Sequence, residues 1–194
     1  MLFRSELKLE TISAHIGYDA LMNNLDKELE YLNILGAKFI VCPGAEMKTV
    51  DSALKRAEEF NVIGEKAKKA GLILGYHNHD HELVLDNGKY PLEVFFENTD
   101  PAYVAMQPDL FWVAYAGLDP INYVIKHKER IPVVHFKQIK DMETKANVDA
   151  GSGIIDFKKV TELLPNATYI YEQEQYIGTS MEDAKKSIDF LKNM

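Results

Sequence analysis

Short apolar runs alternate with longer amphipathic segments along the whole chain. Six runs carry strand-type residues, at 7–16, 37–44, 72–79, 102–109, 131–137 and 167–174. Helix-type segments follow them at 24–36, 49–71, 91–99, 120–130, 157–164 and 180–193. Near-continuous apolar strands separated by helices are typical of a parallel sheet that helices cover. The sequence therefore predicts an α/β fold of about six βα units, with parallel strands and outer helices.

Local signals mark the ends of two of these helices. The leucines of segment 24–36 recur at helical spacing until Gly36, where a helix of this kind ends. Segment 49–71 has Thr49 or Asp51 as its expected N-cap and ends at Gly71. Both segments are long enough to cover a strand.

Polar side chains close the apolar runs at their carboxyl ends. The residues concerned are His15, Cys42, His77, His79, Asp109, His135 and Glu172. The successive intervals, from His77 to Asp109, from Asp109 to His135 and from His135 to Glu172, are 32, 26 and 37 residues, about one βα unit each. Parallel barrels carry their active sites at this end, where successive strands deliver side chains to a common centre. His77 and His79, two apart on an expected strand, point to one side and Asn78 to the other.

Composition excludes several classes of function. Thirty acidic and 22 basic residues give a net charge of −8, and no block of like charges favours nucleic acid or a membrane surface. Cys42 is the only cysteine, so an internal disulfide, a thiol redox pair and a Cys-based zinc site are excluded. We expect it to be a core or pocket-wall residue. No apolar run approaches the length of a membrane span or a signal peptide, and we expect a cytoplasmic protein.

The strand-end residues suggest a divalent metal. A lone strand-end histidine is more often a hydrogen-bonded core or loop residue, and a lone aspartate before a helix is more often an N-cap. Together, at unit spacing, they make a nitrogen and oxygen ligand set that suits Mn²⁺, Mg²⁺, Co²⁺, Fe²⁺ or Zn²⁺. Nucleotide-binding glycine loops and a nucleophile elbow are absent from the sequence.

Five ordered motifs give the chain a family resemblance. They are "GYHNHDHE", "PDLFWVAYAGLDP", "RIPVVHFK", "GSGIIDF" and "YIYEQEQY", and they begin at residues 75, 108, 130, 151 and 169. In this order they resemble the sugar phosphate isomerase/epimerase group of xylose-isomerase-like TIM barrels. The resemblance covers almost the whole chain, and it implies a single xylose-isomerase-like TIM-barrel domain over residues 1–194.

The resemblance also implies roles for particular residues. Asp109, His135 and Glu172 match three metal ligands of the family, and His77 stands where many relatives have a glutamate. The proposed catalytic residues are Glu172, as ligand and base, with His79 or Glu82 as a second base and Lys137 as a charge-neutralising group. Gln138 stands where the family usually has aspartate. We further expect His15, Trp112 and Glu174 to contact a carbohydrate substrate.

The function implied is a metal-dependent sugar isomerase or epimerase that acts through an enediolate. A lyase or dehydratase on the same scaffold, and a catalytically inert shortened relative with a binding role, are the alternatives. Family barrels have eight strands and six are expected here, so the chain resembles a barrel that lacks its first two βα units. Because six strands leave apolar edges unpaired, we expect a homodimer that covers them.

Overall fold

The computed structural model describes residues 6–194, and the expected strand and helix alternation is present. Each of the six apolar runs contains one strand, and these are β1 (Ser13–His15), β2 (Phe39–Cys42), β3 (Ile73–His77), β4 (Val104–Gln107), β5 (Val133–Phe136) and β8 (Thr168–Tyr171). The pairs β1–β2, β2–β3 and β5–β8 are parallel. The predicted α/β class with parallel strands and flanking helices is thus confirmed.

Among residues 6–194, six helices occupy the predicted segments, and two more, at 18–23 and 110–115, lie where the sequence analysis predicted no helix. They are α2 (Tyr18–Asn23), α3 (Leu25–Leu35), α4 (Val50–Lys69), α5 (Pro91–Glu97), α6 (Leu110–Tyr115), α7 (Pro120–His127), α8 (Phe157–Leu163) and α9 (Ser180–Lys192). Two short 3₁₀ helices, η1 (His81–Leu83) and η2 (Lys128–Arg130), lie in the connections.

The chain forms two compact units. The first runs to His77 and includes Leu85–Ala105, and the second consists of Asn78–Val84 and Met106–Met194. That residues 1–194 make a single domain stays a prediction, and its residues 1–5 lie outside the described part of the chain.

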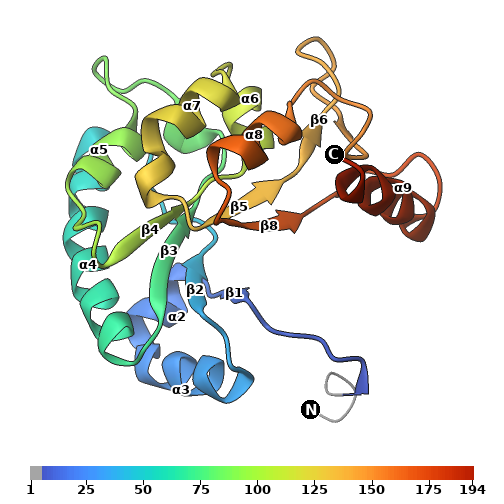
Figure 1. The fold of residues 1–194 in the computed structure, drawn as a ribbon. Helices are drawn as coiled ribbons and strands as arrows, with labels where there is room; N and C mark the ends of the chain where they lie inside the picture. The colour runs from blue at the N-terminus through green and yellow to red at the C-terminus, as the bar shows by residue number, and fades with distance from the viewer. Residues whose placement is uncertain (1–5) are drawn as a thin grey trace. The chain divides into compact units, whose positions relative to one another are not determined.

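The sheet order is β1-β2-β3-β4 (Figure 1), and the first unit contains β1, β2, β3 and the first two residues of β4. α4 packs against β3 and α5. Three buried rings fill the space between them: Phe60 lies edge-on to Phe95 at 5.1 Å between centroids, and Tyr76 lies 5.0 Å from Phe95. Burial of such large aromatic side chains supplies much of the apolar stabilisation of a small core.

β1 and β3 differ from their predicted lengths. Within run 7–16 only Ser13–His15 is a strand, and Leu7 and Leu9 are more than half exposed. The prediction of a strand over the first half of this run is wrong, because no backbone among residues 6–194 forms a strand ladder with residues 7–11. β3 ends at His77, so the strand alternation predicted for Asn78 and His79 does not apply to them.

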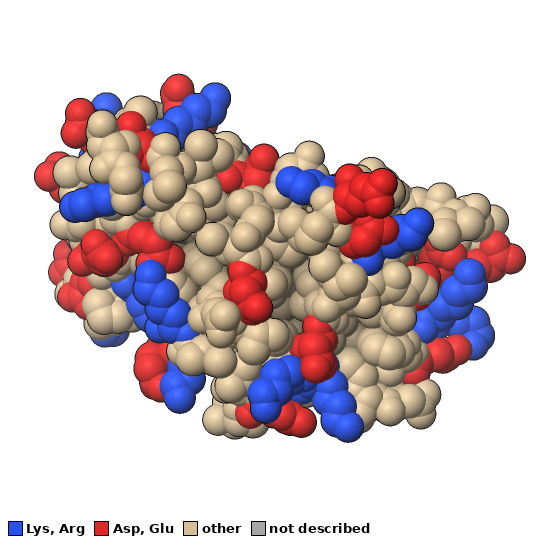
Figure 2. Space-filling model, turned by 90° about the horizontal axis from the view of Figure 1, so that it is seen from above, with Lys and Arg blue, Asp and Glu red and all other residues tan. Residues whose placement is uncertain are grey.

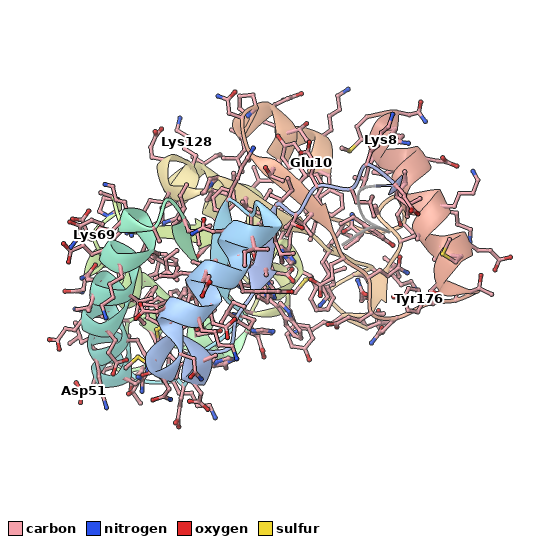
Figure 3. All side chains as sticks on the ribbon, turned by 90° about the horizontal axis from the view of Figure 1, so that it is seen from below. Lys8, Glu10, Asp51, Lys69, Lys128 and Tyr176 are labelled. Carbon is pink, nitrogen blue, oxygen red and sulfur yellow. The ribbon has the colours of Figure 1, made fainter. Side chains whose placement is uncertain are left out.

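The ends of α4 carry the predicted signals. Thr49 is the N-cap, and its hydroxyl accepts a hydrogen bond from the Ser52 backbone N–H while the Ser52 hydroxyl accepts from the Thr49 N–H. Asp51 in the first turn and Lys69 in the last point outward from the two ends of the helix (Figure 3). Both charges oppose the helix dipole and so stabilise the helix. At α3, Gly36 has a φ of 70°, as its predicted role requires.

The second unit holds a parallel pair of strands and a hairpin that the sequence analysis did not predict. β5 and β8 lie side by side, and α9 lies beyond the carboxyl end of β8 (Figure 1). Directly after β5, β6 (Gln138–Ile139) pairs antiparallel with β7 (Asn147–Val148). The hairpin lies in the segment that was predicted as a polar loop.

The surface has no large patch of one charge on the face drawn in Figure 2, and no described helix is a candidate membrane span. Basic and acidic side chains are interspersed on the face drawn in Figure 2. Among residues 6–194, no helix combines the length and apolar character needed to cross a bilayer.

Gly64 gives a test of the packing of α4. A Cβ at this position would lie 2.6 Å from the carbonyl oxygen of Tyr103, whereas one at Gly17 would meet nothing within 4 Å. Gly64→Ala should therefore lower the free energy of unfolding by about 1–3 kcal/mol, although alanine favours helix. Gly17→Ala is the control without a clash and should lower it by at most about 1 kcal/mol, because glycine is the better N-cap of α2. Urea unfolding followed by circular dichroism measures both, and equal stability of the two variants would contradict the packing described.

Candidate metal and active site

Backbone hydrogen bonds in the second unit align the ends of three segments. The His135 N–H donates to the carbonyl oxygen of Pro108 at 2.9 Å, and the Glu172 N–H donates to that of Phe136 at 3.2 Å. Asp109, which is wholly buried, is the N-cap of α6, and its Oδ1 accepts from the Phe111 N–H at 2.9 Å. These contacts place one functional side chain from each segment at the same edge.

Asp109, His135 and Glu172 meet at this edge. Each offers one ligand atom, and the three atoms lie within 4.8 Å of one another. His135 Nδ1 is 2.6 Å from Glu172 Oε2. A single ion with metal–ligand distances of about 2.0–2.3 Å fits a cluster of this span. Two carboxylates and one imidazole also form a ligand set that divalent cations accept, so the residues present fit a divalent metal.

Lys137 connects this cluster to a further carboxylate. Its side chain is 1% exposed, and its Nζ lies 3.1 Å from Glu172 Oε1, 3.0 Å from Glu174 Oε2 and 4.0 Å from Asp109 Oδ2. Glu174 is 60% exposed at its side chain, so it joins the buried ammonium to the surface. Lys137 Nζ also lies 5.0 Å from the centroid of the Trp112 ring, which favours a positive charge through its π face.

Burial and mutual charge shift the pKa values of these groups in different directions. Burial raises the pKa of Asp109 well above its usual range, although Lys137 opposes the shift. The hydrogen bond from His135, with the charge of Lys137, holds the pKa of Glu172 well below its usual range. For Lys137, burial alone would lower the pKa, but attraction to Asp109, Glu174 and Glu172 outweighs it and the net shift is upward. Glu172 and Lys137 are thus a carboxylate and an ammonium at neutral pH.

A second group of predicted residues lies around His79 in the same unit. The His79 ring is 5.3 Å from Trp112 and stacks on His81 at 6.1 Å. Glu82 is completely buried, and its Oε2 accepts a hydrogen bond from the His79 backbone N–H at 2.9 Å. Burial lowers the pKa of His79, so its imidazole is neutral at pH 7. Glu82 thus contacts the backbone of the loop that carries His79.

His15 and His77 belong to the first unit. They are the last residues of β1 and β3, and their ring centroids are 4.9 Å apart with a tilt of 58°. His15 is exposed and His77 is buried. Their predicted roles, substrate contact for His15 and metal ligation for His77, stay predictions.

Three residues that help to build the site were missed as such by sequence reasoning. Asn78 is buried, and its Oδ1 accepts a hydrogen bond from the Asp109 N–H at 3.0 Å. Gln138 is buried and makes four hydrogen bonds with backbone: Oε1 accepts from Ile139 and Ile155, and Nε2 donates to Ala150 and Ile155. Gly153 packs so closely that a Cβ would lie 2.5 Å from the Gln138 side chain.

For one of these three residues, Gln138, the sequence did give a signal, because it directly follows the motif "RIPVVHFK". Gln138 stands where the resembled family usually has aspartate, and its amide both donates and accepts here. An aspartate has no donor for the two carbonyl oxygens that Nε2 reaches. Asn78 gave no comparable signal, because its partner Asp109 is 31 residues away.

The sequence also matches a known family. Residues 14–194 match the family described as xylose isomerase-like TIM barrel. The chain belongs to this family. An inosose dehydratase from Bacillus cereus strain AH820 is 26% identical over an alignment of 159 residues, and the match covers 71% of this chain and 53% of that protein. The chain spans about half to three fifths of the length of the curated relatives first matched.

Solved structures of xylose isomerase-like proteins have the same fold. A sugar phosphate isomerase/epimerase from Parabacteroides distasonis ATCC 8503 has a TM-score of 0.80 at 24% identity, covering 96% of this chain and 72% of that one. A structure of IOLI protein with a bound zinc atom has a TM-score of 0.75 at 12% identity, covering 99% of this chain and 80% of that one. At such identities the likeness concerns the fold.

Replacing Gln138 tests the hydrogen bonds behind the site. Gln138→Glu places a carboxylate oxygen against the carbonyl oxygens of Ala150 and Ile155, and it should lower the free energy of unfolding at pH 8 by roughly 3–5 kcal/mol. Such burial raises the pKa of the new carboxyl group in the folded state. The variant should therefore regain stability at pH 4 and lose it as pH rises through that pKa.

The control is Gln175→Glu, because Gln175 is exposed and its Oε1 only accepts, from the Asn147 N–H. Urea unfolding at both pH values is the measurement. A Gln138→Glu protein as stable as the control at pH 8 would show that the donor role of Gln138 is unimportant.

Proposed function

We propose that Asp109, His135 and Glu172 bind one divalent metal ion and that the chain is a metal-dependent enzyme acting on a sugar or keto-inositol. The supporting observation is the convergence of these three side chains, from three segments, to within 4.8 Å. His77, at the end of β3, is proposed as a further ligand only because it stands at a position where many family members have a glutamate.

The charge at the site supports a divalent ion. Asp109, Glu172 and Glu174 surround one ammonium, that of Lys137. When all four groups are ionised, two negative charges remain, the charge that one divalent cation neutralises. Closely grouped like charges raise each other's energy, and a cation relieves that repulsion. The choice among Mn²⁺, Mg²⁺, Co²⁺, Fe²⁺ and Zn²⁺ stays open, although the zinc in the IOLI structure favours a test of zinc.

The reaction proposed begins with removal of the proton α to a ketone. A bound divalent ion would supply Lewis acidity that polarises the carbonyl. His79 is the proposed base, since its lowered pKa leaves the imidazole neutral at pH 7 and so able to accept a proton. Glu172, with its lowered pKa, is better suited to ligation than to basicity. Trp112 offers a ring beside His79 on which an apolar sugar face can pack.

Loss of the α proton would leave an enediolate, and two outcomes are proposed for it. Sugar isomerisation or epimerisation is the first. Reprotonation of the same carbon on its opposite face gives an epimer, and reprotonation of the neighbouring carbon gives an isomer. Lys137 would offset the negative charge of the carboxylates around it. Elimination of water is the second candidate, and the curated relatives named inosose dehydratase favour it. An inert relative with a binding role remains the rival class. The homodimer also stays a prediction.

Metal binding is the first test. Titration calorimetry of the chelator-treated protein with Mn²⁺ should give one site per chain. Glu172→Gln keeps the shape of the side chain but removes its charge, so affinity should fall at least ~100-fold, more than the 10–100-fold typical of residues that only support a ligand. Glu162→Gln on α8, an exposed glutamate paired with Lys159, is the matched control and should bind as the wild type does. No Mn²⁺, Zn²⁺ or Co²⁺ binding by the wild type would refute the proposed site.

Deuterium incorporation separates the two reactions. Incubation with inosose in D₂O and Mn²⁺, followed by NMR and ultraviolet absorbance, is the measurement. Epimerisation should place one deuterium α to the carbonyl without a new absorbance. Dehydration removes the α proton and the β hydroxyl as water, and the conjugated product should absorb in the ultraviolet. His79→Gln should slow either reaction about 10²–10⁴-fold. If neither inosose nor any of a panel of ketohexoses exchanges or loses its α proton, the hypothesis of an inert relative replaces that of an enzyme.

A further inference from the structure

Asn147, at the start of β7, joins the two segments that carry Lys137 and Glu174. It is buried, and its backbone N–H donates to Gln175 Oε1 at 3.1 Å. Its side-chain Oδ1 accepts from the N–H groups of Glu174 at 2.6 Å and Gln175 at 3.2 Å. Its Nδ2 donates to the carbonyl oxygen of Gln138 at 2.9 Å. One amide thus connects the chain after β5 to the chain after β8.

The hairpin that carries Asn147 is itself anchored. Lys140 N–H donates to the Ala146 carbonyl at 2.8 Å, closing the hairpin. Asp141 Oδ1 accepts from the Thr144 N–H at 2.7 Å, which fixes its turn. Lys145 Nζ donates to the carbonyl oxygen of Tyr115 at 2.8 Å and lies 4.5 Å from the centroid of the Tyr115 ring. Asn147 is therefore held by both its own hairpin and the end of α6.

This arrangement fixes where the Glu174 carboxylate lies. Glu174 follows β8 in an irregular segment, and its side chain is 60% exposed, so neither strand pairing nor burial of the side chain restrains it. The Asn147 amide restrains its backbone instead. As a result, Glu174 Oε2 lies 3.0 Å from Lys137 Nζ, and Lys137 is shared between Glu174 and Glu172.

We propose that Asn147 is a positioning residue that sets the metal affinity of the site through Glu174 and Lys137. The inference rests on the proposed metal site. With Glu174 in place, part of the Lys137 charge is directed away from Glu172 and Asp109. Without it, the ammonium interacts only with the two carboxylate ligands and competes with the cation for them. Asn147 touches no ligand, so its effect passes through Glu174.

The test is a double-mutant cycle read by Mn²⁺ titration calorimetry. Asn147→Ala and Glu174→Gln should each weaken Mn²⁺ binding about 10-fold, within the range for residues that support a metal site. Because both act on the same contact, the double variant should also be about 10-fold weaker. A merely structural role for Asn147 predicts independent losses that multiply to about 100-fold, and that result would overturn the inference.

Asn61 on α4 provides the matched control. Its amide also holds a distant segment, donating to the Asn98 carbonyl oxygen at 3.0 Å and accepting from the Asp100 N–H at 2.7 Å. Asn61→Ala should lower stability yet leave Mn²⁺ affinity within about twofold of the wild type, since it has no contact with the ligand set. An equal loss of affinity in Asn61→Ala would mean that destabilisation alone explains the effect.

Amide hydrogen exchange reports the contact without any metal. In Asn147→Ala the amides of Glu174 and Gln175 should exchange about 5–10-fold faster, because each loses its acceptor. Asn147→Asp keeps the accepting oxygen and should stay within about threefold of the wild type. It is also the second variant if the alanine protein does not fold. Unchanged exchange in Asn147→Ala, or full loss of protection in Asn147→Asp, would overturn the inference. Failure of the wild type to bind Mn²⁺ would overturn the proposed function instead.

Discussion

The buried ammonium of Lys137 is the constraint on which the second unit depends. A charge removed from water is costly unless opposite charges and hydrogen bonds replace its hydration. Glu172 and Glu174 lie 3.1 and 3.0 Å from it, and Asp109 lies 4.0 Å away. These carboxylates come from two segments more than 60 residues apart along the chain. The end of β8, the start of α6 and the residue after β5 must therefore meet for the ammonium to be tolerated.

Local sequence patterns predicted six of the strands and six of the helices but missed α2, α6 and the β6–β7 hairpin. Apolar runs located the six strands β1 to β5 and β8, and the glycine after α3 and the threonine before α4 marked helix ends as expected. The predictions failed where the pairing of one strand with another decides whether a segment is a strand. Residues 7–11 have strand-like composition, but within the described part of the chain no neighbouring strand pairs with them, so the strand is limited to Ser13–His15. The β6–β7 hairpin has two residues in each strand, too few for a periodic signal.

The part of the candidate site that lies at strand ends was predictable from the sequence. Because parallel strands present their carboxyl ends on one edge, the spacing of Asp109, His135 and Glu172 predicted that they meet. The residues that hold them were not predictable in this way. Asn78 and Asn147 act on backbone groups 31 and 27 residues away, and an asparagine in a polar stretch is more often a turn residue. Only a departure from a known motif, as at Gln138, marks such a position in one sequence.

The two units are interleaved along the chain, and this affects how they can form. The chain passes from one unit to the other after His77, after Val84 and after Ala105. The first unit cannot be complete before its last segment, 85–105, has been synthesised, and segment 78–84 has its partners only after residue 106. Contacts between such distant segments raise the contact order, which slows folding. A single cut in the chain therefore cannot release either unit intact, and a nascent chain must leave the first sheet unfinished while it waits for β4.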